Sequence, residues 1–100
     1  MSINSDAADI LESAAFVIGT GHHAKGRFWD GYGWCALGAM GSADLELRGN
    51  EDAHAVALDA LQRVIGGVAT IAAWNDAPER TPEEVEAAML KAAARLRGEA

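Results

Sequence analysis

Apolar residues recur at every third or fourth position in three long segments of the chain, which is the spacing of one face of an α-helix. These segments span residues 5–18, 51–65 and 82–97. The last has the clearest start, because Thr81 can cap the helix, Pro82 suits its first turn and Glu84 completes a capping box. The pattern therefore predicts three helices.

Two shorter apolar segments, residues 34–43 and 68–74, are also predicted to be helical. No charged residue lies between Asp30 and Asp44, so no face of the first of these two helices prefers water. We expect that helix to be buried on nearly all sides, packed against the first and the last helix of the chain. Gly38 would permit the close approach.

Residues 19–33 are rich in glycine and show no helical period. They are predicted to form either a short β-hairpin at about residues 24–33, with Asp30 and Gly31 in the turn, or an irregular loop. Residues that favour strands are scarce elsewhere. The predicted fold class is therefore all-α, with four to five short helices around a small alanine-rich core. We expect residues 1–100 to form a single helical domain.

Composition and charge narrow the classes of partner and location. Alanine accounts for 22 of the 100 residues, and 15 Asp and Glu against 8 Lys and Arg give a net charge of -7. Such a surface disfavours a nucleic-acid partner. The single cysteine excludes a disulfide framework and fits a reducing compartment, so we expect a cytoplasmic protein with no membrane partner. A homodimer is one way to cover the apolar faces of such small helices.

Three motifs follow one another in a distinctive order: WCALGA at residues 34–39, WNDAP at residues 74–78 and TPEEV at residues 81–85. Their combination resembles a family of small domains of unknown function found in actinobacteria and their phages. The likeness covers residues 10–95, nearly the whole chain. It implies no particular activity.

Cys35 is the candidate catalytic nucleophile, because it lies at the start of a predicted helix, where the helix dipole favours a thiolate. His54 could act as its base, and Asn75 or Asp76 could orient that histidine, as in a thiol enzyme. The structural alternative is that Cys35 is a small buried residue at a tight helix crossing, which its small neighbours such as Gly38 favour.

His22 and His23, together with Cys35 and Asp30, form a candidate metal site. Adjacent histidines point in different directions, and the sequence has no CxxC or HxxxH spacing to support them. We therefore expect solvated loop histidines, with neither a metal ion nor another cofactor.

The candidate partner-binding residues are Arg27, Phe28, Trp29 and Tyr32. They form an aromatic, locally basic stretch on an acidic chain, and aromatic residues with arginine dominate the energetics of protein interfaces. The alternative is that the three rings fold inward and enlarge a core that is poor in large side chains.

These observations predict a non-enzymatic protein-interaction or regulatory module that binds another protein. The first alternative is a thiol enzyme centred on Cys35 with a histidine. The other alternative is an acidic mimic of nucleic acid, although the acidic residues are spread over most of the predicted helices rather than gathered on one face.

Overall fold

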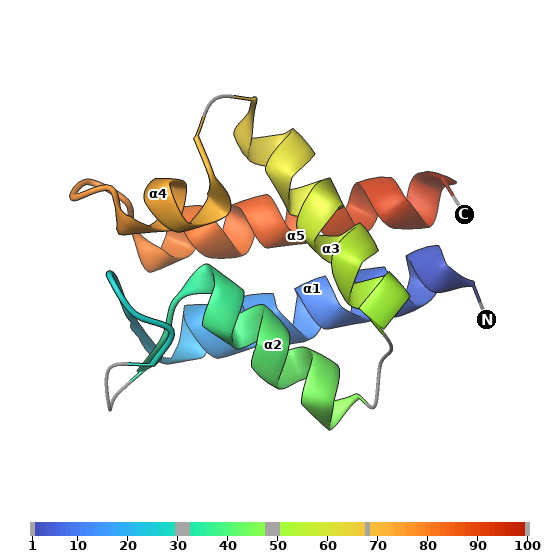
Figure 1. Cartoon of the computed structure of the whole chain (residues 1–100), viewed down its shortest axis with the longest axis horizontal. Coiled ribbons are helices and arrows are strands. Elements are labelled where there is room, and N and C mark those ends of the chain that lie inside the picture. The colour runs from blue at the N-terminus through green and yellow to red at the C-terminus, as the bar shows by residue number, and fades with distance from the viewer. Residues whose placement is uncertain (1, 30–32, 48–50, 68, 100) are drawn as a thin grey trace.

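Five α-helices make up most of the part of the chain that the computed structural model describes, namely residues 2–29, 33–47, 51–67 and 69–99 (Figure 1). The helices are α1 (Ile3–Thr20), α2 (Ala36–Glu46), α3 (Glu51–Ile65), α4 (Ile71–Asp76) and α5 (Pro82–Glu99). The predicted all-α fold class is confirmed. Within the described ranges, no helix is both long enough and apolar enough to cross a membrane.

Helix α1 lies at the centre of the packing. It runs antiparallel to α5, with which it shares its largest interface; α3 packs across this pair, and α2 packs on α1 (Figure 1). Helix α4 contacts α2 and α3. At the outer edge of the α1–α5 pair, the guanidinium of Arg97 donates hydrogen bonds to the carboxylates of Asp9 and Glu12, at distances of 2.7 to 3.0 Å.

Most of the buried residues of the described core are alanines, so the helix axes can approach one another closely. The larger side chains in this core are Ile10, Leu11, Ile18, Met40, Leu61, Ile71, Val85, Met89 and Leu96. Both Trp34 and Trp74 are partly buried and pack against the same cluster. The expectation of a small alanine-rich core is confirmed.

The helix starts follow the capping residues. Thr81 and Glu84 form the predicted capping box of α5, since each accepts a hydrogen bond from the other's backbone N–H, at 3.2 and 3.1 Å. Helix α1 begins earlier than predicted because Ser2 caps it, its Oγ accepting a hydrogen bond from the N–H of Ser5. Helix α2 begins later than predicted because Cys35 is its N-cap rather than part of its first turn.

Helix α2 differs from its prediction in what surrounds it. One face buries Ala36, Ala39, Met40 and Ala43 on the core, whereas Leu45 on the opposite face is 81% exposed. The helix packs mainly on α1, while α5 packs on α1 and α3. The expectation of a helix buried on nearly all sides is therefore wrong, because the outer face of α2 has no described helix over it.

The segment before α2 contains two strands of two residues each, β1 (His22–His23) and β2 (Gly33–Trp34), which pair in parallel. Trp34 also forms an antiparallel bridge with Trp29, and the N–H of Cys35 donates to the carbonyl oxygen of Phe28 at 3.0 Å. The chain thus reverses as the hairpin prediction requires, but with one bridge in place of a ladder. The predicted turn, Asp30–Gly31, lies outside the described residues.

Candidate protein-binding site

Asn75 holds the candidate loop against the start of α2. It is the single polar residue in the buried class among the described residues, with 1% of its surface exposed. Its Oδ1 accepts from the N–H of Ala36 at 3.0 Å, and its Nδ2 donates to the carbonyl of Ala24 at 3.0 Å and to Asp76 at 2.9 Å. A buried amide with these partners fixes three segments of the chain relative to one another.

His23 completes this network. Its Nε2 lies 2.6 Å from Oδ1 of Asn75. The hydrogen bond from the N–H of Ala36 identifies this atom as the amide oxygen, which can only accept hydrogen bonds. Nε2 of His23 must therefore carry the proton that it donates. Although the side chain of His23 is only half-buried, its contact with Asn75 anchors β1 to the end of α4.

The next residues of the WNDAP motif continue the attachment. The Asp76 carboxylate accepts the N–H of Gly26 at 2.9 Å, and Nζ of Lys25 donates to the carbonyls of Ala77 and Pro78 at 2.7 and 3.1 Å. The Gly26 hydrogen bond, followed by that from the Asn75 side chain, lowers the pKa of Asp76 from its ordinary value of 3.8. The loop is therefore tied to Asn75 and to the three residues that follow it.

Gly38 brings the same loop onto the side of α2. A Cβ atom at this position would lie 2.4 Å from the carbonyl oxygen of Phe28 and 2.9 Å from the ring of Trp34. The expected close approach at Gly38 is present, but the partner is the backbone of the loop rather than another helix. Phe28 is consequently held beside α2 with 64% of its surface exposed.

Two adjoining cavities lie on either side of Phe28 and Leu37, and we call them together the α2 groove. The first has a volume of about 300 Å³ and is lined by Gly26, Arg27, Phe28, Cys35, Leu37, Ala72 and Asp76. The second has a volume of about 400 Å³ and is lined by Phe28, Trp34, Leu37, Gly38, Gly41, Ser42 and Leu45. Both cavities are predominantly apolar, with Arg27 and Asp76 at the first and Ser42 at the second as their polar lining side chains.

The predicted partner-binding residues meet at this groove as far as they are described. Arg27 and Phe28 line it, and the ring of Trp29 contacts that of Trp34 in a tilted arrangement, with ring centroids 4.9 Å apart. Phe28 and Trp29, which is 48% exposed, do not fold into the core as the alternative proposed. Tyr32 lies outside the described residues.

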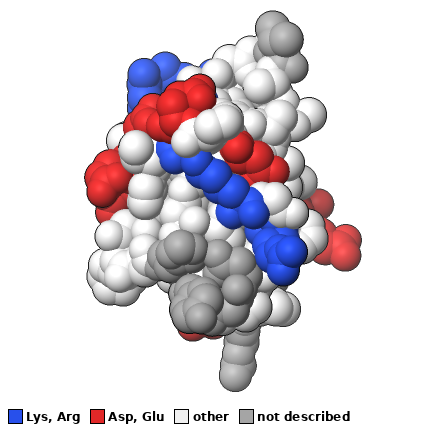
Figure 2. Space-filling view, turned by 90° about the vertical axis from the view of Figure 1, so that its left-hand side faces the viewer, with Lys and Arg blue, Asp and Glu red and all other residues white. Residues whose placement is uncertain are grey.

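Basic side chains gather on the end of the molecule that carries this loop. Figure 2 shows a diagonal band of Lys and Arg side chains across that end, between groups of Asp and Glu. Lys25 and Arg27 come from the loop itself, and Arg80 follows α4. The Arg80 guanidinium lies 4.4 Å from the ring centroid of Trp74, so it is held by a cation–π contact.

The structure places Cys35 and His54 at different ends of α2. Cys35 is buried, and its Sγ accepts a hydrogen bond from the N–H of Gly38 at 3.3 Å. His54 on α3 lies instead beside Asp44, with Nδ1 to Oδ2 at 3.8 Å. Cys35 and Asp44 are nine positions apart, which is about 13 Å along a helix axis.

The structure does not describe all four candidate metal ligands, His22, His23, Asp30 and Cys35. Asp30 lies outside the described residues, and within the described ranges no three His, Cys, Asp or Glu side chains are placed to hold a metal ion. His23 is directed to Asn75 instead.

Three residues that line the groove were not singled out by the sequence, namely Leu37, Gly41 and Leu45. Asn75 was predicted only as a residue that could orient His54, whereas in the structure it supports the groove as a hub. The spacing of four positions between Leu37, Gly41 and Leu45 marks a second apolar face on α2. The absence of charge led instead to the expectation of burial, because an all-apolar helix usually lies inside a core.

A family model described as a family of unknown function (DUF6197) matches residues 3–95. The chain belongs to this family. The DUF6197 match includes all five helices as far as Arg95, and so includes the α2 groove and the hub around Asn75. No curated protein and no solved structure matches the chain.

Proposed function

We propose that this DUF6197 domain is a non-enzymatic protein-interaction module that binds a partner protein in the α2 groove. The observation that carries the proposal is the exposure of large apolar side chains around one pair of cavities. Leu45 is 81% exposed and Phe28 is 64% exposed, and both line the groove. Contiguous exposed apolar surface is uncommon on monomers and is typical of interaction sites.

The groove is prepared for a partner before any partner binds. The backbone of Phe28 is held by the hydrogen bond from the Cys35 N–H to its carbonyl and by its close approach to Gly38. The ring of Trp29 is held against that of Trp34. A loop backbone that is already in place lowers the entropic cost of binding, because less conformational freedom remains to be lost. An interface centred on Phe28 and Trp29 is therefore favoured.

The lining also indicates the chemistry of the partner. The second cavity offers Leu37 and Leu45 to apolar side chains, and Arg27 at the first cavity offers a guanidinium to a carboxylate. The partner segment is therefore an amphipathic one, with apolar side chains along α2 and an acidic side chain at the end beside Arg27. Helices with an apolar stripe bind grooves in this manner.

The source of the domain is part of the same proposal. The order of the WCALGA, WNDAP and TPEEV motifs and the high alanine content support an actinobacterial or phage origin. An actinobacterial lysate is therefore the appropriate source of partners.

The test compares variants of the groove with a matched variant elsewhere. Candidates captured from the lysate by the full chain are identified, purified and titrated against each variant by calorimetry. We expect Phe28→Ser and Leu45→Ser each to weaken binding about tenfold or more, since each truncates an apolar contact. Phe16→Ser is the control, because Phe16 is 68% exposed on α1 and does not line the groove.

Two outcomes would contradict the proposal. The first is a purified partner that binds Phe28→Ser, Leu45→Ser and the wild-type chain with equal affinity. The second is a dimer of the chain itself that Leu45→Ser dissociates in sedimentation experiments, since the occupant of the groove would then be a second copy.

A further inference from the structure

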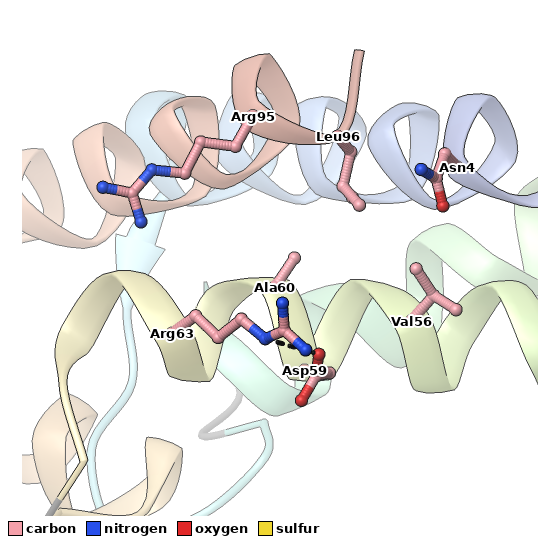
Figure 3. A pocket seen from close by; sticks show the side chains of 7 residues that line it. All are labelled: Asn4, Val56, Asp59, Ala60, Arg63, Arg95 and Leu96. Atoms are coloured by element: carbon pink, nitrogen blue, oxygen red, sulfur yellow. Dashed lines mark ion pairs between the residues drawn. The ribbon is translucent and has the colours of Figure 1, made fainter. Parts of the chain in front are cut away.

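A groove between α3 and α5 lies apart from the α2 groove and shares none of its lining residues. It has a volume of about 530 Å³ and is lined by Asn4, Val56, Asp59, Ala60, Arg63, Arg95 and Leu96 (Figure 3). Pockets for small molecules have volumes of about 300 to 1,000 Å³, so this groove has room for one. We propose that it binds a small amphipathic carboxylate.

The centre of the groove is apolar. Figure 3 shows Leu96 pointing from α5 toward Ala60 on α3, with Val56 one turn before Ala60. Leu96 and Ala60 are largely buried and belong to the core, whereas Val56 is only partly buried. An apolar ligand body laid along these side chains would remove their remaining exposed surface from water, which is favourable in proportion to the area covered.

Two of the chain's eight Lys and Arg residues line this groove. Arg63 comes from α3 and Arg95 from α5. In Figure 3 the Arg95 guanidinium lies on the side of Ala60 away from Asn4, whereas that of Arg63 lies beside Asp59. On a chain with a net charge of -7, two guanidinium groups at one apolar groove select for an anion. A planar carboxylate suits the donor geometry of arginine.

Asp59 limits how much of this charge is available. Its Oδ2 lies 3.0 Å from Nε of Arg63, one turn along the same helix, and both side chains are more than half exposed. Exposed pairs of this kind contribute little free energy, so a ligand carboxylate can compete for Arg63. Arg95 faces the groove from α5 without belonging to that pair, so it is the principal donor to the ligand.

Asn4 defines the opposite end. Its side chain points into the groove from the first turn of α1, beside Val56 (Figure 3). The groove thus runs from the Arg95 guanidinium, across an apolar centre, to a neutral amide. A ligand with a carboxylate at one end and an alkyl or aryl body fits this order, whereas a second anionic group would meet no cation beside Asn4.

The test is a titration of the full chain with octanoate, followed through the backbone amide signals in ¹⁵N NMR spectra. We expect the signals of Val56, Ala60 and Leu96 to shift. Arg95→Gln should weaken octanoate binding about fivefold or more, because it removes the charge-assisted hydrogen bonds to the carboxylate. Octan-1-ol, which has the same alkyl chain without the charge, should bind more weakly than octanoate.

Lys91→Gln is the matched control. Lys91 lies one turn before Arg95 on α5, is exposed and does not line the groove, so its removal changes the net charge equally. It should leave the octanoate affinity unchanged. The proposal is overturned if octanoate shifts signals around Phe28 and Leu37 instead. It is also overturned if the Arg63→Gln/Arg95→Gln double variant binds octanoate as tightly as the wild-type chain.

Discussion

Nε2 of His23 and Oδ1 of Asn75 lie 2.6 Å apart although the two residues are 52 positions apart in the chain. The same oxygen accepts the N–H of Ala36, which lies 39 positions before Asn75 in the chain. One amide thus connects β1, the start of α2 and the end of α4. In a domain whose core consists largely of alanine, this polar contact fixes the loop where large apolar side chains are scarce.

Asn75→Ala should lower the free energy of unfolding by about 2–4 kcal/mol, because it leaves the Ala36 N–H and the Ala24 carbonyl without this partner. Urea denaturation followed by circular dichroism measures the change. Asn4→Ala is the control, since Asn4 is only half-buried, and it should change stability by less than about 0.5 kcal/mol. Similar costs for the two variants would show that the hub contributes nothing.

Gly38 and Gly41 form a matched pair in α2. A Cβ at Gly38 would lie 2.4 Å from the Phe28 carbonyl, whereas a Cβ at Gly41 meets nothing within 4 Å. Gly38→Ala should therefore destabilise the domain by about 1–3 kcal/mol, because backbone must move to relieve the overlap. Gly41→Ala should stabilise it by about 0.5–1 kcal/mol, through helix propensity alone. Thermal melts that shift in the same direction for both would contradict this placement of the loop.

Asp76 should make stability depend on pH in the acid range. Its pKa in the folded state is lowered from 3.8, mainly by the Gly26 N–H and the Asn75 side chain. Its contribution to the free energy of unfolding is therefore complete above the unfolded-state pKa. It is lost as the pH falls through the lower, folded-state value.

The measurement compares the wild-type chain with Asp76→Asn by urea denaturation at about pH 7 and at about pH 2.5. At the higher pH the wild-type chain should be more stable than Asp76→Asn, and this difference in the free energy of unfolding should shrink at the lower pH. If the difference between the two chains is the same at both pH values, the carboxylate charge makes no contribution.

Cys35 should behave as a helix cap. Its Sγ accepts the Gly38 N–H, and serine is a preferred residue at this position. Cys35→Ser should therefore cost less stability than Cys35→Ala, which should lose about 1 kcal/mol. The folded chain should also react slowly with iodoacetamide, because Cys35 is 7% exposed. Fast labelling would instead favour the thiol-enzyme alternative.

The sequence predicts the fold well wherever a local signal exists. Helix α3 has the predicted bounds, and the capping box of Thr81 and Glu84 starts α5 as expected. The environment of α2 could not be predicted in the same way. The absence of charge indicates that the side chains of a segment avoid water. It does not indicate whether another part of the fold covers each face of the helix.

The candidate site was predictable only in part, for the same reason. Arg27 and Phe28 stand out by composition, and both line the α2 groove. Their neighbour Leu45 comes from the far end of α2, and the residue that supports them, Asn75, comes from α4. These contacts span the chain, so no local pattern contains them. The Asn–Asp pair at 75–76 is a common turn former, and the burial of Asn75 appears only in the fold.

The pairing of α1 with α5 also affects how the chain reaches its native state. Arg97 contacts residues 85 and 88 positions earlier, so the largest helix interface closes almost the whole chain into a loop. Helical domains usually fold fast because their contacts are local, whereas closing such a loop costs entropy before any packing is gained. During synthesis α1 therefore has no α5 to pack on until the last helix leaves the ribosome. The apolar face of α1 that α5 covers in the fold lacks that cover during this interval.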